Sequence, residues 1–502
     1  MKTNFLILDI TKILKDSLIL MLLGTFALSQ MTCGGGSKGN NTIGKAPYPP
    51  DELSAKPGNG EVLIKWREVN NAISYNVYFS TLPNISKTSG TKISNVRSPF
   101  YHTGLKNNTT YYYFVTAANN YGESVESKVI NATPLASIIN KYIGATINDY
   151  LAKKVWDVWK DFSPLPILHK NGFGWARVWV RNTSSNDLRN TPPSNWNTLP
   201  WKEEYWSSLE YAEKILKESS QEGMRLNLVF LLSDKPAYSF NQPAPPEWDG
   251  LNLDESADAL EEYCYNTTKY FKDKGLNIEI YDIGNEIEYG ILNFLPGQRV
   301  YLPPGIDVIT DMDWMKNNIW NLEAVLLKAA IRGVKRADPN AKITLHINTL
   351  GLRPENYIVK SFFRAMVDYG VEFDYAGLSF PYFNYYDFPQ PYFDSSQWKE
   401  VIDYISSLGK KIIISEFTYP HSSNGITGIP DPAYPFTPEG QAKWIKDFLA
   451  FFRNNQNIAA IFYFYPDYFP GMSRGSTPEH ESSGLFINET QIMPAMLEFN
   501  LD

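Results

Sequence analysis

Two glutamates stand where runs of apolar residues end, and their side chains could work as a pair. Glu286 follows the alternating apolar stretch 276–284, and Glu416 lies near the end of the stretch 411–417. A carboxylate at the end of an apolar strand is either misplaced or useful. Two carboxylates that face each other across a cleft can catalyse retaining glycoside hydrolysis, in which one attacks the anomeric carbon and the other protonates the leaving oxygen. A separation of about 5–5.5 Å suits direct attack.

The elements that would carry these glutamates repeat along the chain. Eight short apolar runs alternate with amphipathic or helix-like stretches, which is typical of βα units. Eight such units in a row predict a TIM barrel over residues 138–502, and in that fold the carboxyl ends of the strands carry the chemistry. Glu286 ends the fourth run and Glu416 the seventh, so we expect both at one rim. The predicted strands are 141–147, 175–180, 225–233, 277–284, 342–348, 374–380, 411–417 and 459–465.

Three polar residues near the glutamates fit the same chemistry. Asn285 can donate a hydrogen bond to a sugar hydroxyl, and interactions of that kind strengthen in the transition state. Arg177 in the second predicted strand and His346 in the fifth can add charge and hydrogen bonds around the pair. A strand-end Arg or His is at least as often a structural partner, so both interpretations of these two residues stay open.

Length, charge and composition restrict the remaining functions. A chain of 502 residues exceeds what one hydrophobic core usually serves, so at least two domains are expected. A formal net charge of −8 argues against nucleic acid as a partner, because its phosphates require a basic surface. The 13 Trp and 32 Tyr residues are either rings that stack on sugars or parts of large aromatic cores.

Residues 1–33 are typical of an export signal. Lysines precede the apolar stretch 18–28, which is too short to span a bilayer comfortably. The following "SQMTCGGGSKGNN" resembles a bacterial lipoprotein signal in which Cys33 is lipidated, although residues 30–32 depart from the usual box. An ordinary cleaved signal peptide is the alternative. We predict an exported protein, either a cell-surface lipoprotein or a secreted one, whose contact with a membrane is limited to the lipid anchor.

Two further features complete the reading of the amino-terminal part and of the cysteines. Residues 34–45 are rich in Gly, Ser, Asn and Lys, which is typical of a flexible linker. Cys264 is the only other cysteine and lies in a helical pattern, so it is predicted to be a packed, inert thiol. With Cys33 as an anchor, no intrachain disulfide is expected.

Residues 46–134 contain short alternating strands separated by turn residues, which predicts a small β-sandwich. The stretch resembles a fibronectin type III module, an immunoglobulin-like all-β fold. The resemblance rests on "GEVLIKW", "SYNVYFS" and "GLKNNTTYYYFVTAANNYGES", with Trp66, Tyr75, Tyr78, Leu105 and Tyr111. In that family the Trp and the Tyr of the later strand pack the core. The resemblance therefore implies a spacer or binding module without catalysis.

The predicted barrel resembles glycoside hydrolase family 53, the arabinogalactan endo-β-1,4-galactanases, within a clan whose acid and nucleophile follow strands four and seven. The resemblance runs in order through 142–499 and includes "LPILHKNGFGWARVWV", "LVFLLSDKPAYSFNQPAPPEW", "GNEIEYGIL", "LHINTLG", "FDYAGLSFPYF" and "IIISEFTYP". It implies that Glu286 is the acid/base and Glu416 the nucleophile of a double-displacement mechanism that needs no cofactor or metal. The sugar-site residues that it implies are Asn285, Arg177, Asp234, His346 and Ser379. The implied partner is a β-galactan-like polysaccharide, and we expect a monomer.

The chain departs from the family pattern around the sugar subsites, although it retains the two glutamates. Trp175-Ala176-Arg177 stands where the family has Arg-x-Arg, and Phe464-Tyr465 stands where a Trp-Glu pair closes strand eight. We therefore expect Trp175 and Tyr465 to border the sugar. Thr146, Leu231 and Asn384 replace a family Asp, His and Trp. These losses motivate two alternatives: a non-catalytic carbohydrate-binding or adhesion lipoprotein built on a decayed barrel, and a hydrolase or transglycosylase for another glycan.

Overall fold

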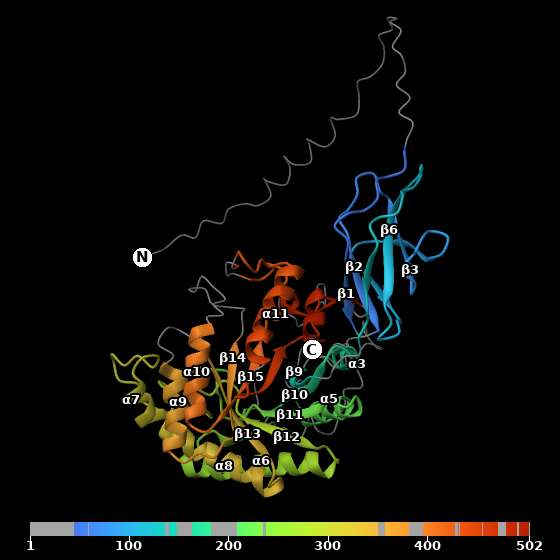
Figure 1. Cartoon of the computed structure of the whole chain (residues 1–502). Coiled ribbons are helices and arrows are strands. Elements are labelled where there is room, and N and C mark those ends of the chain that lie inside the picture. Colours follow the sequence, from blue (N-terminus) through green and yellow to red (C-terminus); the bar gives the residue numbers. More distant parts are fainter. Residues whose placement is uncertain are drawn as a thin grey trace, which may run out of the picture.

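The computed structural model consists of an all-β region and a barrel surrounded by helices (Figure 1). It describes residues 45–58, 60–135, 140–147, 163–181, 208–233, 237–349, 357–380, 395–426, 430, 432–453, 455–469, 478–488 and 491–500. The predicted export signal with Cys33, and the linker up to residue 44, lie outside the described residues. Asp234 and Asn384 also lie outside them.

Two antiparallel sheets form the all-β region. The strands are β1 (Ser54–Gly58), β2 (Glu61–Lys65), β3 (Ser74–Ser80), β4 (Thr91–Val96), β5 (Phe100–Thr103), β6 (Tyr111–Asn119), β7 (Gly122–Glu123) and β8 (Ile130–Ala132). One sheet has the order β1-β2-β5, and the other has the order β4-β3-β6-β7 with β8 paired to β6. Alternation along the strands directs Val62, Ile64 and Val77 into one core between the sheets. Trp66 and Tyr111 are buried in that core, as expected.

Eight parallel strands close into one barrel in the order β10-β11-β12-β13-β14-β15-β16-β9. All eight predicted strands are present, so the predicted TIM barrel is confirmed. Their observed bounds are β9 (Asn140–Thr146), β10 (Phe173–Val180), β11 (Arg225–Phe230), β12 (Ile278–Ile283), β13 (Lys342–Asn348), β14 (Tyr375–Phe380), β15 (Lys411–Phe417) and β16 (Ile458–Phe464).

Helices surround the barrel (Figure 1). They are α3 (Pro164–Lys170), α5 (Leu209–Gln221), η2 (Pro246–Trp248), α6 (Leu253–Asp273), α7 (Met312–Met315), η3 (Lys316–Trp320), α8 (Asn321–Ala337), α9 (Tyr357–Asp368), α10 (Ser395–Ser407), α11 (Pro438–Arg453), α12 (Pro478–Ser483) and η4 (Pro494–Asn500). A short hairpin of β17 (Phe486–Asn488) and β18 (Gln491–Ile492) precedes η4. The sequence encodes some of the helix starts: Asn252 and Glu255 form a capping box at α6. Within the described residues, no helix combines the length and apolar character needed to span a membrane.

The barrel interior changes from apolar to polar along the strands. Inward-facing residues fill such a barrel in layers. Arg177 on β10 and Asp282 on β12 lie two positions further along their strands than Trp175 and Ile280 of the apolar layer. Both are fully buried. Because a strand advances about 3.3 Å per residue, this polar layer lies about 7 Å closer to the carboxyl ends. The apolar layer consists of Trp175, Ile280, Ile413, Ala460 and Phe462.

The all-β region packs against the carboxyl-terminal segment of the barrel. Leu63 of β2 belongs to the hydrophobic core of the barrel, and the hydroxyl of Tyr101 on β5 donates to the carbonyl of Ile492 at 2.7 Å. Three ion pairs also cross the interface between the described residues: Lys65–Glu439 at 2.7 Å, Lys170–Glu61 at 3.2 Å, and Lys56–Glu498. The two regions therefore share a mixed apolar and polar interface.

Candidate active site

A sharp turn after β12 holds Glu286 at the carboxyl end of the barrel. Gly284 has a φ of 91° and Glu286 a φ of 51°, a left-handed conformation that glutamate rarely adopts. A Cβ on Gly284 would lie 2.3 Å from Cγ2 of Ile287, so the turn requires glycine there. The side chain of Gln242 donates to the carbonyls of Asn285 at 2.7 Å and Glu286 at 3.1 Å. The surrounding structure thus maintains a strained backbone at this glutamate.

Arg177 links the side chains that point into the polar layer. Its Nε donates to Asp282 at 2.9 Å, and its Nη1 donates to Oε1 of Glu416 at 2.8 Å. A longer contact of 3.4 Å joins Nη1 to the hydroxyl of Thr146. The side chains of Arg177 and Asp282 are fully buried and that of Glu416 is 5% exposed. Glu416 is therefore held by a charged donor in a dry environment.

His346 continues this network from β13. Its Nδ1 lies 3.1 Å from Nη2 of Arg177, and its Nε2 lies 2.7 Å from the hydroxyl oxygen of Ser379. Because arginine can only donate, Nδ1 must accept and the imidazole proton must sit on Nε2. Burial and the positive charge of Arg177 hold the pKa of His346 well below its ordinary value. His346 is therefore neutral and donates to Ser379.

The carboxyl group of Glu286 has neutral partners instead. Its Oε1 accepts a hydrogen bond from the side-chain amide of Asn348 at 3.0 Å, and its Oε2 accepts one from the hydroxyl of Ser239 at 3.4 Å. The hydroxyl of Ser379 also acts on this carboxyl group and lowers the pKa of Glu286. Glu286 is only 8% exposed. The two glutamates at the rim thus have unlike surroundings.

These surroundings determine which glutamate loses its proton first. Burial raises the pKa of Glu416 to about 8, with Arg177 opposing that rise through its charge and its hydrogen bond. Burial also raises the pKa of Glu286. Its neutral hydrogen-bond donors oppose that rise more strongly than the charge of Arg177 does. Since Arg177 donates directly to Glu416, that residue is the better site for the negative charge. Environments that separate two carboxyl groups in this way suit them to a base or nucleophile role and an acid role.

Asn285 lies beside Glu286 with its side chain buried. Its Nδ2 donates to the carbonyl of Ala237 at 3.0 Å. Among the described residues, no group pairs with its Oδ1. The expected role of Asn285 was donation to a sugar hydroxyl; the atom left without a partner in the structure is the acceptor oxygen, which can receive a hydrogen bond from such a hydroxyl.

Sequence similarity identifies the family to which this site belongs. The sequence pattern of glycosyl hydrolase family 53 matches residues 157–499 of the 502-residue chain. The chain belongs to glycosyl hydrolase family 53. It is accordingly a glycosyl hydrolase, and the part of the chain that matches the family lies within the region of the eight-stranded barrel.

The relatives of this family 53 hydrolase have low sequence identity to it, but the matches cover most of their length. An arabinogalactan endo-beta-1,4-galactanase from Humicola insolens is 25% identical over 330 residues, which cover 62% of this chain and 83% of that protein. An uncharacterized protein from Niallia circulans is 28% identical over 280 residues, which cover 54% and 71%. A solved family 53 catalytic domain from Ignisphaera aggregans superposes with a TM-score of 0.55 and 22% identity, and covers 72% of this chain and 96% of that one. This last likeness supports the fold.

The structure brings most of the predicted site residues of the family 53 hydrolase together. Arg177, His346 and Ser379 have no exposed area, and their contacts are with the carboxyl groups and with one another. Their geometry suits positioning of the two glutamates more than direct contact with a sugar. Tyr465 follows β16 at the same end of the barrel, with its ring 5.1 Å from that of Tyr468. Asp234 lies outside the described residues.

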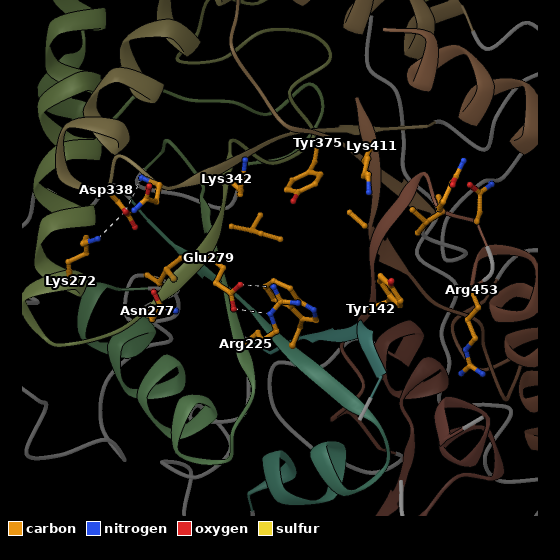
Figure 2. A pocket seen from close by; sticks show the side chains of 18 residues that line it. Tyr142, Arg225, Lys272, Asn277, Glu279, Asp338, Lys342, Tyr375, Lys411 and Arg453 are labelled. Atoms are coloured by element: carbon orange, nitrogen blue, oxygen red, sulfur yellow. Dashed lines mark hydrogen bonds and ion pairs between the residues drawn. The ribbon is translucent and has the colours of Figure 1, made fainter. Parts of the chain in front are cut away.

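Trp175 is the exception, and its expected place beside the sugar is wrong. It belongs to the apolar layer, and the guanidinium of Arg225 stacks on its ring at 3.9 Å. Both residues line a cavity of about 710 Å³ at the amino ends of the strands, with Tyr375 and Lys411 (Figure 2). Two residues of strand separate Trp175 from Arg177, which places its side chain one layer too deep to reach the opposite rim.

Sequence reasoning missed several residues that complete the site. Asp282, Asn348 and Ser239 contact Arg177 or Glu286, and Glu288 lies behind Glu286. Asp282 had a visible signal, because it alternates in phase with Ile280 and so shares its inward face. The others depend on loop contacts that a sequence pattern does not display. Within the described part of the chain, no group of three or more His, Cys, Asp and Glu side chains could hold a metal ion.

Proposed function

We propose that this chain is a retaining endo-glycosidase that hydrolyses β-1,4-galactan or a related β-linked polysaccharide, with Glu286 as acid/base and Glu416 as nucleophile. The observation that carries the proposal is the unequal environment of the two buried carboxyl groups at one rim of the barrel. The galactanase names of several relatives support the choice of substrate. A second endo-beta-1,4-galactanase among them, from Bacillus subtilis, is 22% identical over 286 residues.

In the first step, the ionised form of Glu416 attacks the anomeric carbon while Glu286 gives its proton to the leaving oxygen. Because burial raises the pKa of Glu416 to about 8, this reactive form becomes more populated as the pH rises. Arg177 donates to Oε1 of Glu416, so it stabilises the carboxylate and fixes its orientation for attack. The hydrogen-bonded series from Arg177 through His346 to Ser379 links the nucleophile to the side of Glu286. The two glutamates are thereby positioned by one buried network.

In the second step, Glu286 acts as a base. It has lost its proton to the leaving group, so it can take one from a water molecule that attacks the glycosyl-enzyme ester and releases Glu416. The bond between the sugar and Glu416 breaks, and Glu286 regains the proton with which the cycle began. A raised pKa at Glu286 serves both steps, because the group must be an acid at rest and a base later.

The test uses purified protein, β-1,4-galactan and an activated aryl β-galactoside. Glu286→Gln and Glu416→Gln should each lower the hydrolysis of galactan at least about a thousandfold. Glu262→Gln, at an exposed position on α6, is the control and should retain full activity. Full activity in either rim variant would overturn the assignment of roles.

Azide distinguishes the two roles. With an activated β-galactoside, azide should rescue Glu286→Ala and give the β-galactosyl azide, since it attacks the covalent intermediate. It should rescue Glu416→Gly and give the α-azide, since it replaces the nucleophile. The opposite stereochemistry would exchange the roles. Binding of galactan by the intact protein without any hydrolysis would instead support a non-catalytic carbohydrate-binding lipoprotein.

We also propose that residues 46–134 are a fibronectin type III spacer in front of a barrel spanning 138–502, and that Cys33 anchors the exported protein through a lipid. The shared core of the two amino-terminal sheets supports the first point, and the sequence of the export signal supports the second. Metabolic labelling with a radioactive fatty acid tests the anchor. Label should enter the wild-type protein and be absent from Cys33→Ala; an unlabelled wild type would indicate an ordinary secreted protein.

A further inference from the structure

A second carboxyl group lies directly behind Glu286 and shares its hydrogen-bond donors. Glu288 is fully buried, and it accepts from the hydroxyl of Ser239 at 2.6 Å and from the backbone N–H of Asn348 at 2.9 Å. The same hydroxyl contacts Glu286 at 3.4 Å, and the side-chain amide of Asn348 donates to Glu286 at 3.0 Å. One hydroxyl proton cannot serve two carboxylates at once. The two carboxyl groups are therefore connected through Ser239.

A third carboxyl group, on α8, lies near this pair and takes no part in the proposed mechanism. Glu323 is fully buried, and neither of its oxygens has a hydrogen-bond partner among the described residues. Burial and the charge of Glu288 hold the pKa of Glu323 well above its ordinary value, so it is neutral. The π-helical turn η3 immediately precedes α8, and its Trp320 donates from Nε1 to the backbone carbonyl of Glu288 at 2.9 Å. Such π-turns are frequent near functional sites.

We propose that Glu288 is a positioning residue for the acid/base: Glu286 and Glu288 hold a single proton between them, and the charge on Glu288 keeps that proton on Glu286. The inference rests on the proposed role of Glu286. Burial raises the pKa of both carboxyl groups, and the charge of Glu286 adds to the rise at Glu288, to about 8, so the pair does not ionise fully at neutral pH. The two oxygens of Glu288 accept the shorter bonds, at 2.6 and 2.9 Å, and these bonds favour the charge on Glu288 at rest. Glu286, with its longer contact of 3.4 Å to Ser239, retains the proton.

The proton balance agrees with both steps of the reaction. When Glu286 protonates the leaving oxygen, two adjacent carboxylates become negative in a buried place. Their repulsion raises the affinity of Glu286 for a proton, which it then takes from the attacking water. No proton is stored on Glu288 over the cycle. Its effect is to make Glu286 a stronger base after the first step and to keep it protonated to a higher pH before it.

The other charged and titratable groups around the pair do not replace this effect. Arg177 acts on Glu286 by its charge, but its direct hydrogen bonds to carboxylates go to Asp282 and Glu416. The imidazole of His346 is neutral. Among the described residues, Arg177 of β10, Glu416 of β15 and Glu323 of α8 interact with the pair by charge, whereas Asp282 of β12 and His346 of β13 contact Arg177.

The experiment compares the pH dependence of kcat/KM for wild type, Glu288→Gln and Glu323→Gln on an aryl β-galactoside. The basic limb reports the proton on the acid/base of the free enzyme. In Glu288→Gln it should move down by about one pH unit or more, because the neighbouring charge is gone. Glu323→Gln removes an already neutral carboxyl group of the same size and should leave the limb in place. An unmoved limb in Glu288→Gln, or an equal shift in both variants, would overturn the proposal.

Two further measurements separate failure of this inference from failure of the proposed function. Glu288→Asp retains the charge and should restore most of the wild-type profile, whereas a purely structural role for the longer side chain would not be rescued. Infrared titration of the buried carboxyl groups needs no turnover, and the double variant Glu323→Gln, Glu416→Gln removes the other two described carboxyl groups with raised pKa values. If wild type hydrolyses no galactoside, or if Glu288→Gln does not fold, a protonated carboxyl band that persists to neutral pH in this double variant supports the shared proton. Loss of every such band below about pH 5 overturns it.

Discussion

The two ends of the barrel gather charged side chains in opposite ways. At the amino ends of the strands, ion pairs form near solvent. Figure 2 shows the pair Arg225–Glu279, whose side chains are 44% and 33% exposed. In the pair Lys342–Asp374 the side chains are 54% and 29% exposed. At the carboxyl ends, the buried guanidinium of Arg177 faces several acidic groups. Water screens and solvates the first set, whereas the second set depends on its own hydrogen bonds.

This difference indicates where the fold serves stability and where it serves chemistry. At the amino end the positive and negative charges are paired, and the guanidinium of Arg225 covers the ring of Trp175. At the carboxyl end, among the described residues, Glu286, Glu288 and Glu416 outnumber the buried guanidinium of Arg177, which acts on the first and the last of them, so not all three can ionise. Such an arrangement lowers the stability of the folded protein. Carboxyl groups whose pKa values are shifted in this way are concentrated at functional sites.

The largest difference between the two ends should appear when a cation is removed. Arg177→Met leaves Asp282 and Glu416 buried without a positive partner, so the free energy of unfolding should fall by about 3–5 kcal/mol and activity should be lost. Lys342→Met at the amino end should cost less than about 1 kcal/mol, because its partner Asp374 stays hydrated. Urea unfolding of both variants measures the contrast. Similar losses from the two substitutions would show that burial does not distinguish the ends.

The second contrast is the effect of pH on stability. Burial raises the pKa of Glu416 from 4.5 to about 8, so the folded protein binds this proton more tightly than the unfolded chain does. The resulting stabilisation is complete below about pH 4.5 and is lost as the pH rises to about 8. Relative to wild type, Glu416→Gln should therefore gain stability progressively over that range, by an amount on the order of a few kcal/mol at its upper end.

The comparison with wild type isolates the carboxyl group. The lowered pKa values of His102, His346 and His421 act in the opposite direction, but they do so in both proteins. Midpoints of thermal unfolding at constant ionic strength, measured every half unit of pH, give the result. Parallel curves for wild type and Glu416→Gln would mean that this glutamate is already ionised in the folded protein throughout the range.

The sequence alone was sufficient to predict the barrel and the position of the two glutamates at its rim. Apolar runs bounded by turn residues are local signals, so all eight strands were predicted near their observed bounds. Once eight βα units are recognised, topology alone places Glu286 and Glu416 at one end of the barrel. The alternation that identifies a strand would also have placed Asp282 inward, beside Arg177.

Depth and loop contacts were beyond the sequence. Trp175 and Arg177 lie on one face of one strand, and nothing local tells which of the two layers reaches the rim. Whether Arg177 binds sugar or carboxylate depends on burial, which is a property of the closed barrel. Glu288 and Glu323 approach each other only because the turn after β12 packs beneath η3 and α8. Their separation of 35 positions carries no pattern from which the contact could be inferred.

The smallest expected effect belongs to the ion pair at the amino end. Arg225 and Glu279 make a bidentate contact, with distances of 2.8 and 2.5 Å, on a partly exposed surface. A double-mutant cycle with Arg225→Gln and Glu279→Gln should give a coupling free energy of about 0.2–1 kcal/mol, and hydrolysis of galactan should be unchanged. Arg225 also covers Trp175, so the single variant at 225 should cost somewhat more than the one at 279. A much larger coupling free energy, or a change in activity, would contradict this expectation. It would show that the amino end also affects catalysis and that the two ends differ less than their burial indicates.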